Sequence, residues 1–221
     1  MDLQMMFLLF IIYSFLGWAL EVCYVSIKNK KLTARGFFIG PYCPIYGTGA
    51  LLMTLLLEKY SEDIFILFFM SCILGAILEY FTSYLMEKIF KTRWWDYSDK
   101  KYNVNGRICL ENIIVFGILG VLMIKFLNPF FENILSIMPD ILYNVLTISL
   151  LIIFMADLIV SFNIISNIKR VDLSDAKDST EEVTKKVMEV LRQRSILNKR
   201  LVNAFPNLKI DFSRFKINKN V

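Results

Sequence analysis

Five apolar stretches, each close to the thickness of a bilayer, constrain the fold of this chain more than any other feature. They lie at about residues 4–27, 40–57, 64–86, 108–127 and 141–162. A helix needs roughly 20 apolar residues to cross the hydrocarbon core, where it satisfies its own backbone hydrogen bonds. Hydrophobic residues make up 56% of the chain, too many for an ordinary soluble domain. We therefore expect an all-α, polytopic membrane bundle with five transmembrane helices.

Basic residues gather in three segments: after the first stretch, between the third and fourth, and after the fifth. Of the 25 Lys and Arg residues, only Lys59 and Lys125 lie elsewhere. Because basic loops stay in the cytoplasm, this distribution predicts five crossings of the cell (inner) membrane, with the N-terminus outside and the C-terminus cytoplasmic. The opening MDLQMM carries an acid and no basic region, so the first stretch is expected to be a retained helix in the lipid bilayer.

The composition becomes polar and charged after the last stretch, which divides the chain into a transmembrane domain (1–165) and a cytoplasmic tail (166–221). Residues 179–182 have the spacing of a helix capping box. Apolar residues then recur at three- and four-residue steps: Val183, Val187, Val190, Leu197 and Leu201. The pattern predicts one amphipathic helix that ends at Pro206 and packs on the protein, the membrane surface or a partner.

The first two stretches resemble the next two. FLGWALE (15–21) matches ILGAILE (73–79), and GFFIGPYCPIYG (36–47) and GRICLENIIVFG (106–117) begin and end with Gly at equal spacing. In both copies a Gly lies four residues before a Glu, on a face that a neighbouring helix can approach closely. Each pair begins outside, so we expect a parallel repeat of helices 1–2 and 3–4 about an axis near the membrane normal. The fifth stretch has no counterpart.

Two prolines stand at the start of the second stretch. Pro41 and Pro44 remove backbone donors, so the helix there should start late or break. A broken helix could line a cavity, whereas a plain start would place a Pro in the first turn.

Four carboxylates lie within the apolar stretches: Glu21, Glu79, Glu111 and Asp157. At a rise of about 1.5 Å per residue, the first two lie roughly 9–10 Å inside the cytoplasmic ends of their helices. The other two lie near the same side, so we expect the four acids to share one layer. An ionised carboxylate facing lipid costs on the order of 2.5–3.5 kcal/mol at mid-helix, so these side chains should face the interior or reach the interface.

Two interpretations of the acids remain open. In one, they line a polar cavity, open to the cytoplasm, that binds a cation, a proton or an amine-bearing ligand. In the other, they pair with Arg35, Arg93 or Arg107 from adjacent loops and hold helix ends together. Trp94 and Trp95, in the sequence RWWDYS, are interpreted as aromatic anchors at the membrane interface.

Several chemistries find no support in the sequence. The absence of His excludes imidazole catalysis and His-ligated metal sites. The sequence contains no GxxxxGK[ST] phosphate loop, no GxSxG nucleophile turn and no HExxH zinc motif. We therefore expect no enzyme, no catalytic residue, no cofactor, no metal and no nucleic-acid partner.

The chain resembles a family of small bacterial integral membrane proteins, the putative ABC-transporter type IV or CmpB-like permeases, over roughly residues 5–165. The resemblance rests on the Gly-x-x-x-Glu of the first stretch, RGFFIGPYCPIYGTGA, ILEYFTSYLMEKIF and RWWDYSDKKYNVNGRICLENIIVFG. It implies a permease subunit that works with a separate ATPase. It supplies no binding residues.

These observations predict a permease-like membrane component for a small cationic or amphiphilic solute, working with a separate ATPase. Five short spans would need at least a homodimer to enclose a pathway. The alternative is a non-transporting membrane scaffold or regulator whose cytoplasmic tail recruits a partner. The acids should matter for the first function, and the tail for the second.

Overall fold

The computed structural model describes residues 1–30, 36, 38–90, 92–168 and 209–210. Its helices are α1 (Leu3–Asn29), α2 (Pro44–Leu57), α3 (Ile64–Phe90), α4 (Leu110–Leu122), α5 (Asn128–Ser136) and α6 (Asp140–Ile168). The short elements are η1 (Glu58–Tyr60), the π turn η2 (Met123–Leu127), β1 (Thr92–Arg93), β2 (Asn103–Val104), β3 (Ile108–Cys109) and β4 (Lys209–Ile210). Strand β1 pairs with β4 and β2 with β3, both antiparallel. The all-α class is confirmed, and the predicted tail helix lies outside the described residues.

Four helical stretches of the described chain are long and apolar enough to cross a membrane. They are Leu3–Ile27, Ile64–Phe90, Leu110–Ser136 and Asp140–Asn163. The chain is therefore a multi-pass membrane protein whose surface is solvated by a lipid bilayer. Helix α2 has 14 residues, which at about 1.5 Å each gives roughly 21 Å, short of a hydrocarbon core of about 30 Å.

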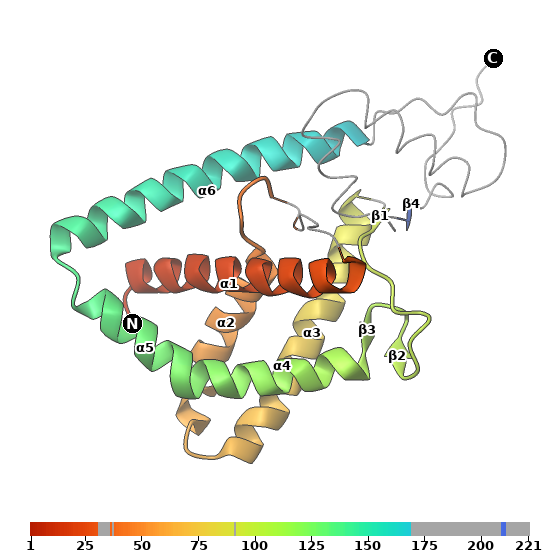
Figure 1. Ribbon diagram of the computed structural model, residues 1–221, viewed down its shortest axis with the longest axis horizontal. Helices are drawn as coiled ribbons and strands as arrows, with labels where there is room; N and C mark the ends of the chain where they lie inside the picture. The colour runs from red at the N-terminus through yellow and green to blue at the C-terminus, as the bar shows by residue number, and fades with distance from the viewer. Residues whose placement is uncertain (31–35, 37, 91, 169–208, 211–221) are drawn as a thin grey trace.

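The helices pack as two neighbouring pairs with α6 along one edge. Helix α1 packs on α2, α3 packs on α4, and α2 joins the pairs through α3. In Figure 1 the first residue and the turn between α5 and α6 lie at one end of the molecule. The ends of α1 and α6, together with β1, β2 and β3, lie at the other, which we call the loop end. Helices α2 and α3 run obliquely and meet at the turn that contains η1.

Away from the loop end, the apolar core encloses one polar network. The core consists of Leu8, Leu9, Tyr13, Ala50, Met53, Leu57, Leu67, Met123, Ile124 and Leu135. At its edge the Tyr13 hydroxyl donates to Asn128 Oδ1, and Asn128 Nδ2 donates to Thr54 Oγ1 at 2.8 Å. All three side chains are buried, so the network ties α1, α2 and α5 together where water is excluded. Asn128 directly follows η2, where α5 leaves the line of α4 (Figure 1).

Each helix pair crosses at a glycine in the matched sequence block. A Cβ atom on Gly17 would overlap the ring of Tyr46 on α2. A Cβ atom on Gly75 would lie 2.6 Å from Cβ of Phe116 on α4. The backbones can approach this closely only because both positions lack a side chain.

The second helix of each pair also contacts the first through a glycine, and these glycines occupy matched positions. Gly47 on α2 faces α1, and Gly117 on α4 faces α3. The atoms nearest to an added Cβ belong to Ser14 and Phe10 in the first pair and to Cys72 and Phe68 in the second. The turns before α2 and α4 correspond as well, since Gly36 and Gly106 have φ angles of 103° and 66°. Both angles lie in the left-handed region that glycine adopts without strain.

Candidate functional site

Two glutamates from the matched blocks meet near the loop end of the bundle. Glu21 on α1 and Glu79 on α3 lie close enough for their charges to interact. Glu79 is 6% exposed, whereas Glu21 is partly exposed. Each Glu lies one helical turn beyond a Gly that is covered by an aromatic side chain of the paired helix, so the two acids occupy equivalent positions.

Neutral side chains donate to both carboxylates. The Tyr46 hydroxyl donates to Glu21 Oε1 at 3.2 Å. The Tyr97 hydroxyl and Asn112 Nδ2 donate to Glu79 Oε1 at 3.1 and 3.2 Å, and Asn112 Nδ2 also donates to Tyr97 Oη at 2.8 Å. Burial raises the pKa of Tyr97 above its usual value, so the phenol keeps its proton and acts as a donor. We call these five residues the carboxylate cluster.

One oxygen of the cluster is unsatisfied. Glu79 Oε2 is buried and has no hydrogen-bond partner within the described part of the chain. Leaving a buried polar atom unpaired costs about 1–3 kcal/mol, and more if the group is charged. Tyr97 and Asn112 are neutral, so they do not cancel the charge of an ionised Glu79. A proton on Oε2, or a bound cation beside it, would remove this cost.

Asp157 occupies a different site on α6. Its carboxylate accepts the backbone N–H groups of Ile39 and Gly40 at 3.0 and 2.6 Å. It also accepts the hydroxyls of Tyr42 and Ser161. Four donors match the acceptor capacity of one carboxylate. Asp157 thus ties α6 to the bent segment before α2, and its four donors all lie outside the carboxylate cluster.

Glu111 lies at the surface in the first turn of α4. Its side chain is 70% exposed, and Lys100 Nζ donates to its Oε2 at 2.7 Å. Although Glu111 precedes Asn112 in the sequence, it points away from the buried carboxylates. The structure therefore brings Glu21 and Glu79 together and places Glu111 and Asp157 at two separate sites.

The arginines proposed as acid partners bind a glutamate that the sequence analysis did not single out. Arg107 and Arg93 both donate to Glu87 Oε2, at 2.9 and 3.2 Å. Arg93 also lies 3.6 Å from Asp96 Oδ1. Both arginines thereby fasten the loop between α3 and α4 to the last turns of α3. Arg35 lies outside the described residues.

The two tryptophans lie at the base of the same loop. Trp94 is 6% exposed and packs edge-on against Phe90, with ring centroids 6.3 Å apart. Trp95 is partly exposed, and its Nε1 donates to the carbonyl oxygen of Arg107 at 3.0 Å. The packing of Trp94 inside the protein and the hydrogen bond of Trp95 both steady the loop. Their predicted position at the lipid headgroups stays a prediction.

Sequence reasoning found the carboxylates but missed their donors. Tyr46 and Tyr97 carried no separate signal, since the chain contains ten tyrosines. One pattern could have indicated Asn112, because it is a polar amide at the start of an apolar stretch. A second could have indicated Glu87, which follows Glu79 by about two helical turns and adjoins the basic loop.

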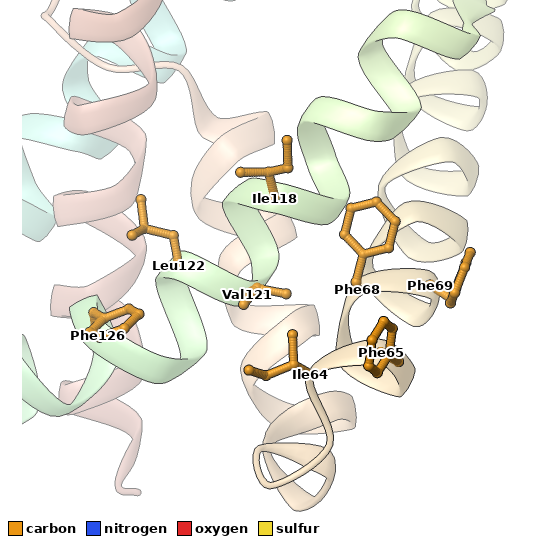
Figure 2. A pocket seen from close by; sticks show the side chains of 8 residues that line it. All are labelled: Ile64, Phe65, Phe68, Phe69, Ile118, Val121, Leu122 and Phe126. Atoms are coloured by element: carbon orange, nitrogen blue, oxygen red, sulfur yellow. The ribbon is translucent and has the colours of Figure 1, made fainter.

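A separate apolar groove lies between α3 and α4. It has a volume of about 450 Å³ and is shown in Figure 2. Its lining consists of Ile64, Phe65, Phe68, Phe69, Ile118, Val121, Leu122 and Phe126. These side chains offer carbon surface only, so the groove suits acyl chains of the surrounding lipid and contributes no polar chemistry to the carboxylate cluster.

Comparison with known proteins identifies the family. No curated protein and no solved structure matches the chain. The family model described as "Putative ABC-transporter type IV" matches residues 8–162. This range includes the carboxylate cluster and Asp157 and ends before the tail. The match covers more than half of the sequence, and the chain belongs to the Putative ABC-transporter type IV family of membrane proteins.

Proposed function

We propose that the chain is a permease-like component of a transporter for a small cationic or amphiphilic solute. In this proposal the carboxylate cluster binds the cation, or a proton that exchanges with it. The observation that carries the proposal is the buried, unpartnered Oε2 of Glu79, whose other oxygen accepts from two neutral side chains. Ionisable groups inside membrane bundles are costly and usually mark substrate or ion pathways.

We also propose five crossings, with α2 as a short span that the bilayer accommodates by local thinning. In Figure 1 the end of α1 and the loop after α3 lie at the same end of the molecule. Lys30 is the C-cap residue of α1. Helix α3 can return the chain to that end only if α2 has first carried it away. The basic segments at the loop end favour a cytoplasmic location for that end and an outside N-terminus.

We further infer that α1–α2 and α3–α4 form a parallel repeat. Its support is the set of matched glycine contacts described above, in which each small residue faces the equivalent neighbour in both pairs. A repeat of this kind makes Glu21 and Glu79 equivalent groups that face each other near the pseudo-symmetry axis. A ligand between them would contact one carboxylate from each pair.

The partners follow from the family and from the sequence. The chain lacks a phosphate-binding loop, so an ABC-type mechanism would take its energy from a separate ATPase subunit. A homodimer would supply the further helices needed to enclose a pathway. The alternative function, a scaffold whose tail recruits a partner, depends on residues 166–221, most of which lie outside the described residues.

The test measures flux in cells, where a separate ATPase would be present. Cells with the wild-type chain should differ from empty-vector cells in accumulation of radiolabelled methylammonium or tetraphenylphosphonium. The double variant Glu21→Gln/Glu79→Gln should abolish this difference at equal protein levels in the membrane. Glu111→Gln is the matched control, because Glu111 is exposed outside the cluster, and it should leave the flux unchanged. Wild-type flux in the double variant would contradict the proposal.

A further inference from the structure

The two glutamates of the carboxylate cluster receive their hydroxyl donors from different kinds of element. Tyr46 belongs to α2, where its ring covers Gly17 and its hydroxyl reaches Glu21. At the matched position on α4, Phe116 covers Gly75 but has no hydroxyl. The donor to Glu79 comes instead from Tyr97, in the longer of the two equivalent loops. The hydroxyl donor thus comes from a helix in one half of the cluster and from a loop in the other half, where Asn112 of α4 also donates to Glu79.

Ion pairs and buried side chains, Trp94 among them, hold that loop to the bundle. Arg93 and Arg107, one on each arm, both bind Glu87 on α3. The Tyr97 N–H donates to the Gly106 carbonyl at 2.8 Å and joins the two arms. Between the arms, most residues of the tip are exposed. Both arms therefore depend on the same acidic side chain, and removal of its charge would leave two largely buried arginines without their shared partner.

We propose that residues 93–109, the loop closure, seal the Glu79 half of the carboxylate cluster from solution. In this arrangement the Tyr97 hydroxyl is the contact that ends on the carboxylate, and Glu87 is the latch that holds both arms. Release of the latch lifts Tyr97 from Glu79 and exposes the cluster to solution at the loop end. The purpose of this movement, admission of a solute, rests on the proposed function, whereas the movement itself can be measured without it.

A native cysteine reports on the closure. Cys109 on β3 is 1% exposed, and it follows by three residues the Gly106 carbonyl that accepts the Tyr97 N–H. A chain with Cys23→Ser, Cys43→Ala and Cys72→Ala keeps Cys109 as its single thiol. In native membranes we expect a water-soluble maleimide to modify this thiol slowly. Glu87→Gln should accelerate the reaction roughly tenfold or more, because it weakens two charge-assisted contacts.

A second variant and two controls keep the test specific. Tyr97→Phe removes only the hydroxyl and should accelerate modification of Cys109 about threefold to tenfold. Tyr102→Phe removes the same atom from an exposed ring at the tip of the loop and should change nothing. A single-cysteine chain that keeps Cys43 instead, which is buried at the start of α2, reports general unfolding and should react at an unchanged rate.

Unchanged modification of Cys109 in both Glu87→Gln and Tyr97→Phe would overturn the loop closure. Equal acceleration at Cys43 and Cys109 would overturn it as well, since the opening would then not be local. The result separates this inference from the proposed function. If the Glu21→Gln/Glu79→Gln chain loses flux but Cys109 modification is unchanged in the loop variants, the proposed function is supported and the loop closure is not. If Cys109 modification accelerates but the flux is unaffected, the loop closure is supported and the proposed function is not.

Discussion

Single glycines determine where the carboxylates of this bundle meet. Gly17 and Gly75 let the ring of an aromatic residue from the next helix rest directly on the backbone. Each of these contacts lies one turn before a glutamate, and the two glutamates lie within range of each other's charge. The close approach is a matter of excluded volume, so it depends on the absence of one carbon atom.

The substitution Gly75→Ala should destabilise the protein. The added Cβ would lie 2.6 Å from Phe116 Cβ, and relieving such a contact in a packed core costs about 1–3 kcal/mol. Gly49→Ala is the matched control, because its nearest contact is the flexible Leu78 Cδ2 at 3.0 Å. Both changes gain the same helix propensity of roughly 1 kcal/mol, so their difference isolates packing. Thermal unfolding in detergent should give a lower Tm for Gly75→Ala, and equal Tm values would contradict this reasoning.

At the residue scale, the carboxylates of the site could be predicted from the sequence, whereas their hydrogen-bond donors could not. Glu21 and Glu79 stand out in the sequence because a charge within an apolar helix has few explanations. Their donors do not stand out, because the pairing of Tyr97 with Glu79 depends on the path of an irregular loop. The arginines were recognised as loop cations, yet their shared partner is Glu87, since that residue lies on α3 within reach of both arms. Local composition predicts which groups are unusual, and tertiary geometry decides which groups they meet.

Among the elements, α6 is the one held least by packing. Large apolar side chains along most of its length are exposed to the membrane. Near its middle, Phe154 packs on Phe10 of α1 and on Tyr42, with ring centroids 5.5 and 5.6 Å away. Asp157 then adds the polar contacts to Ile39, Gly40 and Tyr42 described above. The tether fixes the bent segment before α2 to α6 and satisfies N–H groups that no helix satisfies.

The substitution Asp157→Ala should free that segment while leaving the helices in place. The amides of Ile39 and Gly40 lose their acceptor, so their hydrogen exchange should accelerate, as measured by mass spectrometry of peptides spanning 38–43. Ser161→Ala removes one hydroxyl but keeps the Asp157 carboxylate that accepts both amides, so it should alter this exchange little. Exchange that stays at the wild-type rate in Asp157→Ala would show that the tether does not hold the segment.

Two prolines lie near predicted helix boundaries, and the structure places a boundary at one of them but not at the other. Helix α2 begins at Pro44, as a late start predicts, because a Pro in the first turn lacks only a donor that would be unpaired anyway. The fourth apolar stretch was expected to end near residue 127, but the helical path continues through η2 and α5 to Ser136. Pro129 is tolerated there because it occupies the first turn of α5 after the π turn.

At the scale of the whole molecule, the bilayer explains most of what the sequence could predict. Apolar length and composition identify the membrane helices, because lipid leaves a spanning chain few alternatives. The second stretch is the exception, since its helix is too short to be assigned as a span by length alone. Whether α2 crosses therefore depends on where the segments on its two sides lie relative to the membrane.

Cysteine labelling decides this topology. In a cysteine-free chain, Lys30→Cys, Lys101→Cys and Thr180→Cys should react with a membrane-impermeant maleimide only after the cells are permeabilised. Glu62→Cys and Ile137→Cys, which lie in exposed turns, should react in intact cells. The reason is that three basic segments remain in the cytoplasm when the chain crosses five times.

A chain in which α2 does not cross would give a different labelling pattern. If α2 did not cross, positions 30 and 62 would share one side, and position 101 would lie on the other. That pattern would also separate the end of α1 from the loop that carries Tyr97. In that topology α1 and α3 would end on opposite sides of the membrane. Glu21 and Glu79 both lie near the ends of these helices, so they would be at different depths and could not lie within range of each other's charge. The carboxylate cluster therefore requires that α2 crosses the membrane, and labelling that excludes this crossing would also exclude the cluster.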